Sequence, residues 1–173
     1  NASGPQIVLY RALGQAVFFS FVYLCFRKPS LKAELQSLTV KGWLASVLMA
    51  FAGFFLIMSL QFTLVANAVF IISLTPLIAA ALAWMFLNER ITRRTAVAMT
   101  IDLIGVAIIF GTNVDVQGTV GMAFAGAMAL CYATVLVIMR VIPQANVVLM
   151  CAISGVLTVC LMVPVVETFA IST

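Results

Sequence analysis

Residues 64–87 read LVANAVFIISLTPLIAAALAWMFL, a run of 24 positions that holds no charged side chain. A helix crosses the hydrocarbon core of a bilayer, about 30 Å thick, with about 20 mainly apolar residues. Lipid offers no hydrogen-bond partners, so each crossing segment must satisfy its own backbone. The run is also too long and too continuously apolar for a strand of a membrane barrel. This stretch therefore predicts a transmembrane helix.

The remainder of the chain repeats the same pattern. Apolar runs between charged or turn residues predict five further spans, at 6–26, 42–60, 95–111, 118–139 and 146–166. Of the 173 residues, 65% are hydrophobic and 8% are charged, and the mean hydropathy is +1.24, which leaves no room for a separate soluble domain. We predict an all-α integral membrane protein, built as a bundle of about six transmembrane helices.

The basic residues of the loops lie in alternate connections. Lysine and arginine occur in 27–41, in 88–94 and at Arg140, whereas the opposite connections carry only acidic charge, at Asp115 and Glu167. Basic loops stay in the cytoplasm, so we expect a multi-pass protein of the plasma or inner membrane with both ends of this chain outside. The chain has a net charge of +4, but its basic residues lie mainly in these short loops and not on one solvated face, so we expect no nucleic-acid partner.

The sequence offers little for metal or cofactor chemistry. It has no histidine, and its four cysteines lie in or beside apolar segments without a CxxC spacing: Cys25, Cys131, Cys151 and Cys160. It also has no motif that resembles a nucleotide-binding loop. We therefore expect no metal, no cofactor and no catalytic residue, and we assign the cysteines to packing.

Two predicted spans carry small residues four positions apart. They are Gly121, Ala125, Ala129 and Ala133 in 118–139, and Thr75, Ala79 and Ala83 in 64–87. Helices in lipid associate through such faces because small side chains let the backbones approach. Two interpretations stay open, packing inside one subunit and the face of a homodimer.

Polar side chains at membrane depth are costly and usually face protein or water, so they are the candidate substrate-binding residues. Asp102 lies near the middle of 95–111, either as a proton-coupling group or as a structural residue bonded to a neighbouring helix. Arg11, near the start of the first span, either extends to the membrane surface or holds an anionic substrate group. Gln61 and Asn67 flank a short turn, where they line a cavity mouth or cap helix ends.

Thr75 and Pro76 stand in the middle of the span 64–87. Proline lacks an amide and frees a carbonyl of the preceding turn, so a kink is expected here. Kinked helices border the substrate site in many transporters, although many membrane helices carry a proline without such a role. Tyr132 in 118–139 is an amphipathic aromatic residue that either contacts a solute or packs against neighbouring helices.

The run Thr75–Pro76, the segment FLNER at 86–90 and the pair Gly105–Val106 together resemble the EamA-like family of the drug/metabolite transporter superfamily. Members typically place a mid-helix proline before a helix that ends in leucine, glycine, glutamate and arginine. The sequence TPLIAAALAWMFLNERIT, residues 75–92, is similar to that pattern.

Other positions add to the resemblance or depart from it. Arg11, the spaced small residues of 118–133 and Arg140 match the family pattern. The departures are Asn88 at the usual glycine, Ala98 where glycine is common, and Asp102 where an apolar residue is usual.

The resemblance implies ten helices built as two five-helix inverted repeats. Residues 1–111 would then be helices two to five of the first repeat, and 118–173 the first two helices of the second. We expect the first helix and the last three to be missing from this chain.

The resemblance also implies a secondary transporter that moves a small organic solute, such as a metabolite, an amino acid or a drug-like compound, by alternating access. Proton coupling through Asp102 is one option. The expected partners are the solute and the lipid bilayer, and a homodimer stays open. Two alternatives are a non-transporting helical membrane subunit and an intramembrane lipid-modifying enzyme. Because only Asp102 and Arg11 are ionisable at membrane depth, we expect no enzyme.

Overall fold

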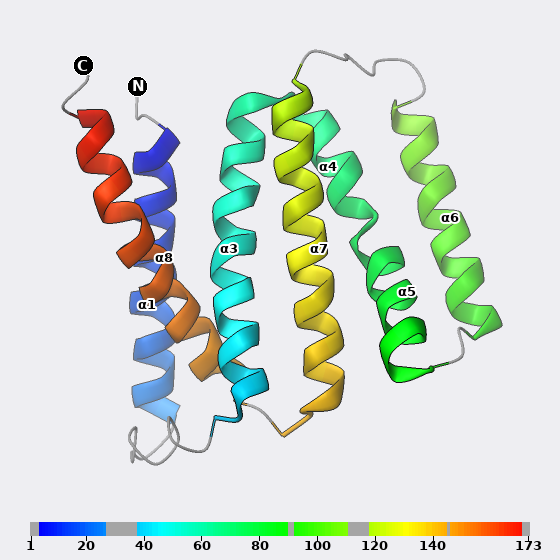
Figure 1. The fold of residues 1–173 in the computed structure, drawn as a ribbon, viewed down its shortest axis with the longest axis horizontal. Coiled ribbons are helices and arrows are strands. Elements are labelled where there is room, and N and C mark those ends of the chain that lie inside the picture. Colours follow the sequence, from blue (N-terminus) through cyan, green and yellow to red (C-terminus); the bar gives the residue numbers. More distant parts are fainter. Residues whose placement is uncertain (1–3, 27–37, 90–91, 111–117, 145, 171–173) are drawn as a thin grey trace. The chain divides into compact units, whose positions relative to one another are not determined.

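The computed structural model describes residues 4–26, 38–89, 92–110, 118–144 and 146–170. Every regular element in these ranges is a helix (Figure 1): α1 (Gly4–Phe26), α3 (Val40–Phe62), α4 (Val65–Ser73), α5 (Thr75–Leu87), α6 (Arg93–Phe110), α7 (Thr119–Val141) and α8 (Val147–Ala170). The all-α prediction is confirmed for the described residues. Five predicted spans each coincide with one helix, and the sixth, 64–87, is broken into α4 and α5.

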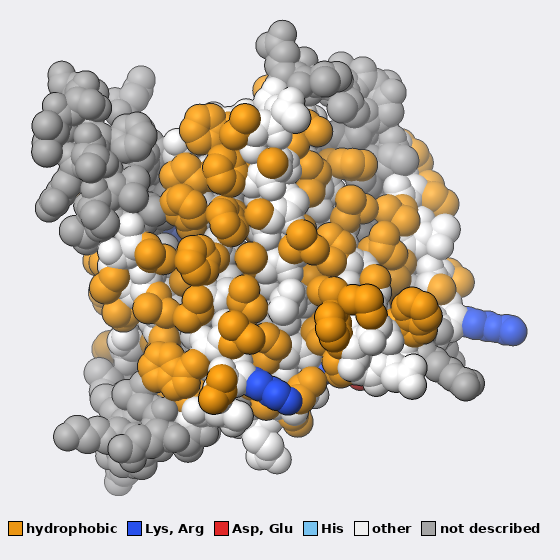
Figure 2. Space-filling view, viewed as in Figure 1, with side chains coloured by type: hydrophobic (Ala, Val, Ile, Leu, Met, Phe, Trp, Pro, Cys, Tyr) orange, Lys and Arg blue, Asp and Glu red, His pale blue; other side chains and the backbone are white. Residues whose placement is uncertain are grey.

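Three of these helical segments are long and apolar enough to cross a membrane, namely Val40–Phe62, Val65–Leu87 and Thr119–Val141. Shorter apolar stretches lie at Thr95–Gly105 in α6 and Val147–Leu161 in α8. Figure 2 shows a face covered mostly by hydrophobic side chains, with few charged ones among the described residues. An apolar exterior of this kind suits a protein whose surroundings are lipid.

The chain divides into two compact units, residues 1–54 with 138–173, and residues 55–137. In the first unit α1 packs along α8, and the two helices cross in Figure 1. A Cβ atom added at Gly155 of α8 would lie 2.9 Å from the backbone nitrogen of Ala16 in α1 and 3.2 Å from its Cβ. Glycine is therefore what lets these two helices approach so closely.

In the second unit the end of α3 packs closely against the beginning of α7. A Cβ atom added at Gly121 would lie 2.6 Å from the backbone nitrogen of Thr63, so only glycine fits there. The ring of Phe124 lies 6.0 Å, centroid to centroid, from the rings of both Phe55 and Phe62. In the same unit α4 contacts both α5 and α6.

The small-residue faces that the sequence singles out are buried inside this chain. Ala125, Ala129 and Ala133 of α7 are completely covered, and the face of α5 is nearly so, with Thr75, Ala79 and Ala83 at most 6% exposed. Packing within one subunit is therefore the correct interpretation for both faces.

Side chains and backbone conformation end the helices where the sequence predicts boundaries. Thr92 Oγ1 accepts a hydrogen bond from the Thr95 amide at the start of α6, and Asn146 Oδ1 accepts one from the Leu149 amide at the start of α8. Both are N-caps. Asn88 ends α5 in the left-handed conformation, with φ 54°. That conformation explains the family's usual glycine here, because asparagine is among the few other residues that adopt it readily.

Candidate functional site

A polar cluster joins α1 to α8 in the first unit. Gln15 is the central residue of α1, and its Nε2 donates hydrogen bonds to Ser154 Oγ at 3.0 Å and to the Cys151 carbonyl oxygen at 3.3 Å. Ser154 is fully buried, and its hydroxyl donates to the same Cys151 carbonyl at 2.9 Å. Thr158 donates to the Ser154 carbonyl at 2.8 Å, one turn further along α8. An amide at mid-helix thus links two helices through hydrogen bonds.

Arg11 lies one turn before Gln15, and its Nη1 donates to the Gly53 carbonyl of α3 at 3.4 Å. At a rise of 1.5 Å per residue, Arg11 is about 6 Å from the midpoint of α1 and Gly53 about 3 Å from the midpoint of α3. The guanidinium therefore reaches sideways to a neighbouring helix. The two roles expected from the sequence, extension to the membrane surface and binding of an anionic substrate group, both stay predictions.

The surface of α1 is divided between polar contacts and apolar exposure. Arg11 and Gln15 are 40° apart around the helix at 100° per residue, so they share one face. Exposed apolar side chains follow another stripe, with Tyr10, Val17 and Phe21 between 63% and 70% exposed. The stripe suits contact with lipid. Arg11 and Gln15 reach α3 and α8 from a face that also carries an exposed apolar residue, because Phe18, seven positions after Arg11, is 60% exposed.

The second unit contains a break two residues before the midpoint of the Val65–Leu87 run. Pro76 has no amide to donate to the Ile72 carbonyl, and the Thr75 hydroxyl donates to that carbonyl instead. The Ser73 hydroxyl donates to the Phe70 carbonyl at 2.7 Å in the same way. The kink expected from Pro76 is confirmed as a break at Leu74, and hydroxyls of the broken segment satisfy the carbonyls around it.

The other predicted residues have different surroundings. Asn67 and Thr75 are buried, at 4% and 6% exposure, whereas Pro76 and Gln61 are exposed. Tyr132 on α7 is 37% exposed. The side chain of Asp102 lies outside the described residues. The structure therefore brings Thr75 and Pro76 together at the break, while a substrate-binding role stays a prediction for every residue in the set.

Two buried hydroxyls lack hydrogen-bond partners among the described residues, at Ser59 and Thr63. Thr63 Oγ1 would lie 2.9 Å from a Cβ atom at Gly118, within the contact between α3 and α7. At Thr63 the close packing leaves no room for a solute.

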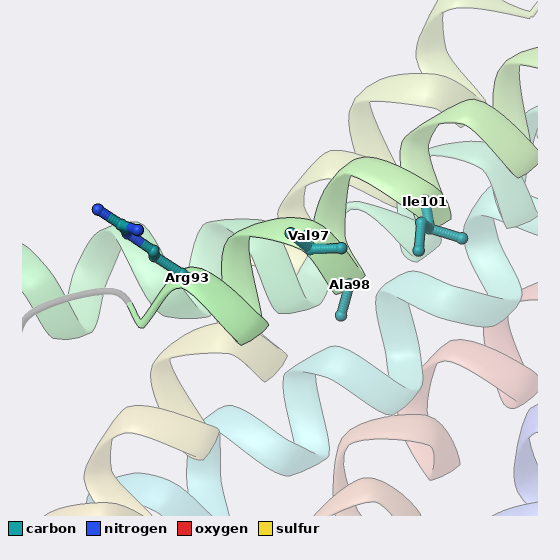
Figure 3. Close-up of a pocket in the computed structure, with 4 residues that line it drawn as sticks. All are labelled: Arg93, Val97, Ala98 and Ile101. Carbon is teal, nitrogen blue, oxygen red and sulfur yellow. The ribbon is translucent and has the colours of Figure 1, made fainter.

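A shallow groove of about 410 Å³ runs along α6 and is lined by Arg93, Val97, Ala98 and Ile101. Figure 3 shows that all four side chains come from this one helix and that Arg93 extends away from it. The lining below Arg93 is apolar, and Val97 and Ile101 are about 60% exposed. The groove can accommodate a hydrocarbon chain, but it offers a polar solute no group apart from Arg93.

Sequence reasoning missed Gln15 and its partners on α8. A signal existed, because Gln15 is an uncharged polar residue in the middle of a predicted span, and Ser154 and Thr158 are spaced by one helical turn. No sequence pattern indicated that these residues meet, since Gln15 and Ser154 are 139 positions apart.

Comparison with known proteins gives one finding. The model of the EamA-like transporter family matches residues 1–111. This range contains α1, α3, α4, α5 and α6, and so includes Arg11, Gln15 and the break at Leu74. No curated protein and no solved structure matches the chain.

Proposed function

Because the chain belongs to the EamA-like transporter family, we propose that it forms part of a secondary transporter that moves a small organic solute by alternating access. The observation that carries this proposal is the break between α4 and α5. It lies two residues before the midpoint of an apolar run of 23 residues, and the Phe70 and Ile72 carbonyls accept hydrogen bonds from within the run itself. Discontinuous helices at this depth commonly border the substrate site of transporters.

The break has the chemistry that a moving element requires. Its hydroxyl bonds are internal to the α4–α5 segment, so the Phe70 and Ile72 carbonyls need no partner from another helix. In this proposal Pro76 breaks the helix because it has no amide, and the Thr75 hydroxyl pairs the Ile72 carbonyl that is left free. Asn67, Gln61 and Tyr132 are proposed as solute contacts, and Arg11 as an anion-binding group.

Proton coupling is assigned to Asp102 in this proposal. A carboxylic acid in the middle of a membrane helix is costly to ionise and can exchange a proton with a wet cavity. The repeat arrangement also belongs to the proposal, with residues 1–111 as helices two to five of one five-helix repeat and 118–173 as the start of an inverted second repeat. The plasma or inner membrane is the proposed location.

The test is transport by the full-length protein reconstituted in liposomes. We expect saturable, protein-dependent uptake of at least one labelled solute from a panel of amino acids and other metabolites. Uptake should respond to a pH gradient, and Asp102→Asn should remove that response while leaving a folded protein. No flux across the panel, with folded and correctly oriented protein, would instead favour a non-transporting membrane subunit.

The remaining alternative, an intramembrane lipid-modifying enzyme, has a separate readout. Incubating the same proteoliposomes with labelled phospholipid and analysing the lipid products would detect such chemistry. We expect no new lipid product.

A further inference from the structure

With the midpoint of α1 placed at the bilayer midplane, the backbone of Arg11 lies at a depth where a charge needs a partner. Half of a hydrocarbon core about 30 Å thick is about 15 Å, so a group about 6 Å from the midplane is about 9 Å inside the nearer surface. Lipid head groups lie outside this region. A charged side chain at such a depth normally faces a water-filled cavity or an opposite charge.

The structure supplies only a weak partner for this charge. The side chain is exposed, and its single hydrogen bond among the described residues is the 3.4 Å contact with the Gly53 carbonyl. A guanidinium has five N–H donors in a planar fork, so most of them remain open. Such a fork matches a carboxylate, which accepts two parallel hydrogen bonds.

Gln15 adds the complementary group one turn away. Among the described residues, both hydrogen bonds of its side chain come from Nε2, and the amide oxygen Oε1 accepts no hydrogen bond. Residues four apart on a helix have Cβ atoms about 5–6 Å apart. Arg11 therefore presents donors and Gln15 presents an acceptor, on one face and at a spacing that a small molecule can bridge.

We propose that Arg11 and Gln15 form a binding site for solutes that carry a carboxylate and, a few bonds away, a hydroxyl or ammonium donor. The carboxylate binds the Arg11 guanidinium, and the donor binds Gln15 Oε1. Ser154 and the Cys151 carbonyl hold the Gln15 amide in place through Nε2, which leaves Oε1 as the atom that accepts the donor. This inference rests on the proposed transport function, and it narrows the class of solute.

The test compares each solute with its own modified form in proteoliposomes of the full-length protein. Inhibition of uptake is measured for a short hydroxy acid or amino acid, for its methyl ester, and for the acid without the hydroxyl or amino group. Arg11→Gln should weaken inhibition by the acid about tenfold or more, because it removes a charge-assisted bond. It should leave inhibition by the ester unchanged.

Gln15→Leu should act on the other group. We expect the preference for the hydroxy or amino acid over the acid lacking that group to fall about fivefold, because a neutral hydrogen bond is lost. A merely structural role would lower uptake of all these solutes equally and would leave their ratios unchanged. Lys41→Gln is the matched control, since it removes one exposed positive charge outside this site.

The outcomes separate the two proposals. Flux that is carried only by solutes without a carboxylate, or ratios that Arg11→Gln and Gln15→Leu leave unchanged, overturns the site while the transport function stands. No flux of any solute by folded wild-type protein overturns the transport function, and the site with it.

Discussion

The α1–α8 pair and the α4–α5 break solve the same problem in opposite ways. Each places polar side chains in the middle of an apolar helical segment, where an unsatisfied carbonyl is costly. In the pair, Gln15 of one helix bonds the Cys151 carbonyl of another. At the break, Ser73 and Thr75 bond carbonyls of their own segment. The Gln15 bond links α1 to α8, whereas the Ser73 and Thr75 bonds do not link α4–α5 to another helix.

The α1–α8 pair is fixed by contacts between two helices, whereas the α4–α5 segment is not tied to another helix by its hydroxyl bonds. Interhelical hydrogen bonds and the close approach at Gly155 fix the spacing of α1 and α8. The Ser73 and Thr75 hydroxyls bond carbonyls inside the α4–α5 segment, so a change in the angle between α4 and α5 breaks no hydrogen bond from these hydroxyls to another helix. Apart from the solute preference assigned to Gln15, we therefore expect changes in the α1–α8 pair to affect mainly stability, and changes at the break to affect mainly transport rate.

The largest expected effect is on the pair, from Gly155→Ala. The new Cβ would lie 2.9 Å from the Ala16 backbone nitrogen, and backbone cannot move aside as a flexible side chain can. Overpacking of this kind costs about 1–3 kcal/mol. Thermal unfolding in detergent should show a midpoint several degrees lower. Gly14→Ala is the control, because its Cβ would meet nothing within 4 Å. Equal midpoints for the two variants would contradict close packing at this crossing.

The next prediction concerns the break, through Pro76→Ala. Alanine restores an amide that can donate to the Ile72 carbonyl and displace the Thr75 hydroxyl, which favours a continuous helix. We expect the transport rate to fall about tenfold, equivalent to about 1.4 kcal/mol in a barrier, with stability unchanged or raised. Initial rates of uptake measure this effect. Pro143→Ala, at an exposed turn, should leave the rate unaltered. Wild-type rates in Pro76→Ala would show that bending at Leu74 is not needed.

A smaller effect is expected from Gln15→Leu, which removes the link without adding a clash. Hydrogen bonds between membrane helices are worth about 0.6 kcal/mol on average and about 1.7 kcal/mol at most in double-mutant cycles. Loosening should expose the thiol of Cys151, which is 5% exposed, to a membrane-permeant reagent. Labelling of Cys151 should rise, while labelling of the exposed Cys160 stays constant as an internal standard. Thr75→Val should leave Cys151 protected, and equal labelling in both variants would remove the distinction between pair and break.

The two regions also differ in how far the sequence predicts them. The break follows from one residue, because proline removes a specific amide wherever it occurs in a helix, and the six apolar runs locate the helices by length alone. The pair depends on which helices become neighbours, and nothing local to Gln15 indicates Ser154. The sideways direction of Arg11 is equally a consequence of the position of Gly53. The break inside one helical run could be predicted from the sequence, whereas the hydrogen bonds of Gln15 and Arg11 to other helices could not.

The smallest expected effect comes from Asn88, at the far end of α5 from the break. Asn88 has φ 54°, and the Glu89 amide donates back to the Ala83 carbonyl at 3.4 Å, which closes the helix end. Asn88→Gly removes the strain of a side chain in this conformation but increases the freedom of the unfolded chain, so stability should change by only a few tenths of a kcal/mol. Asn88→Ala should cost about 1 kcal/mol, because alanine lacks asparagine's local hydrogen bonding in that conformation. The thermal midpoint distinguishes the two, and a more stable alanine variant would contradict the left-handed end. If α5 is anchored here and free at Leu74, uptake by Asn88→Gly should match the wild type, and bending stays confined to the break.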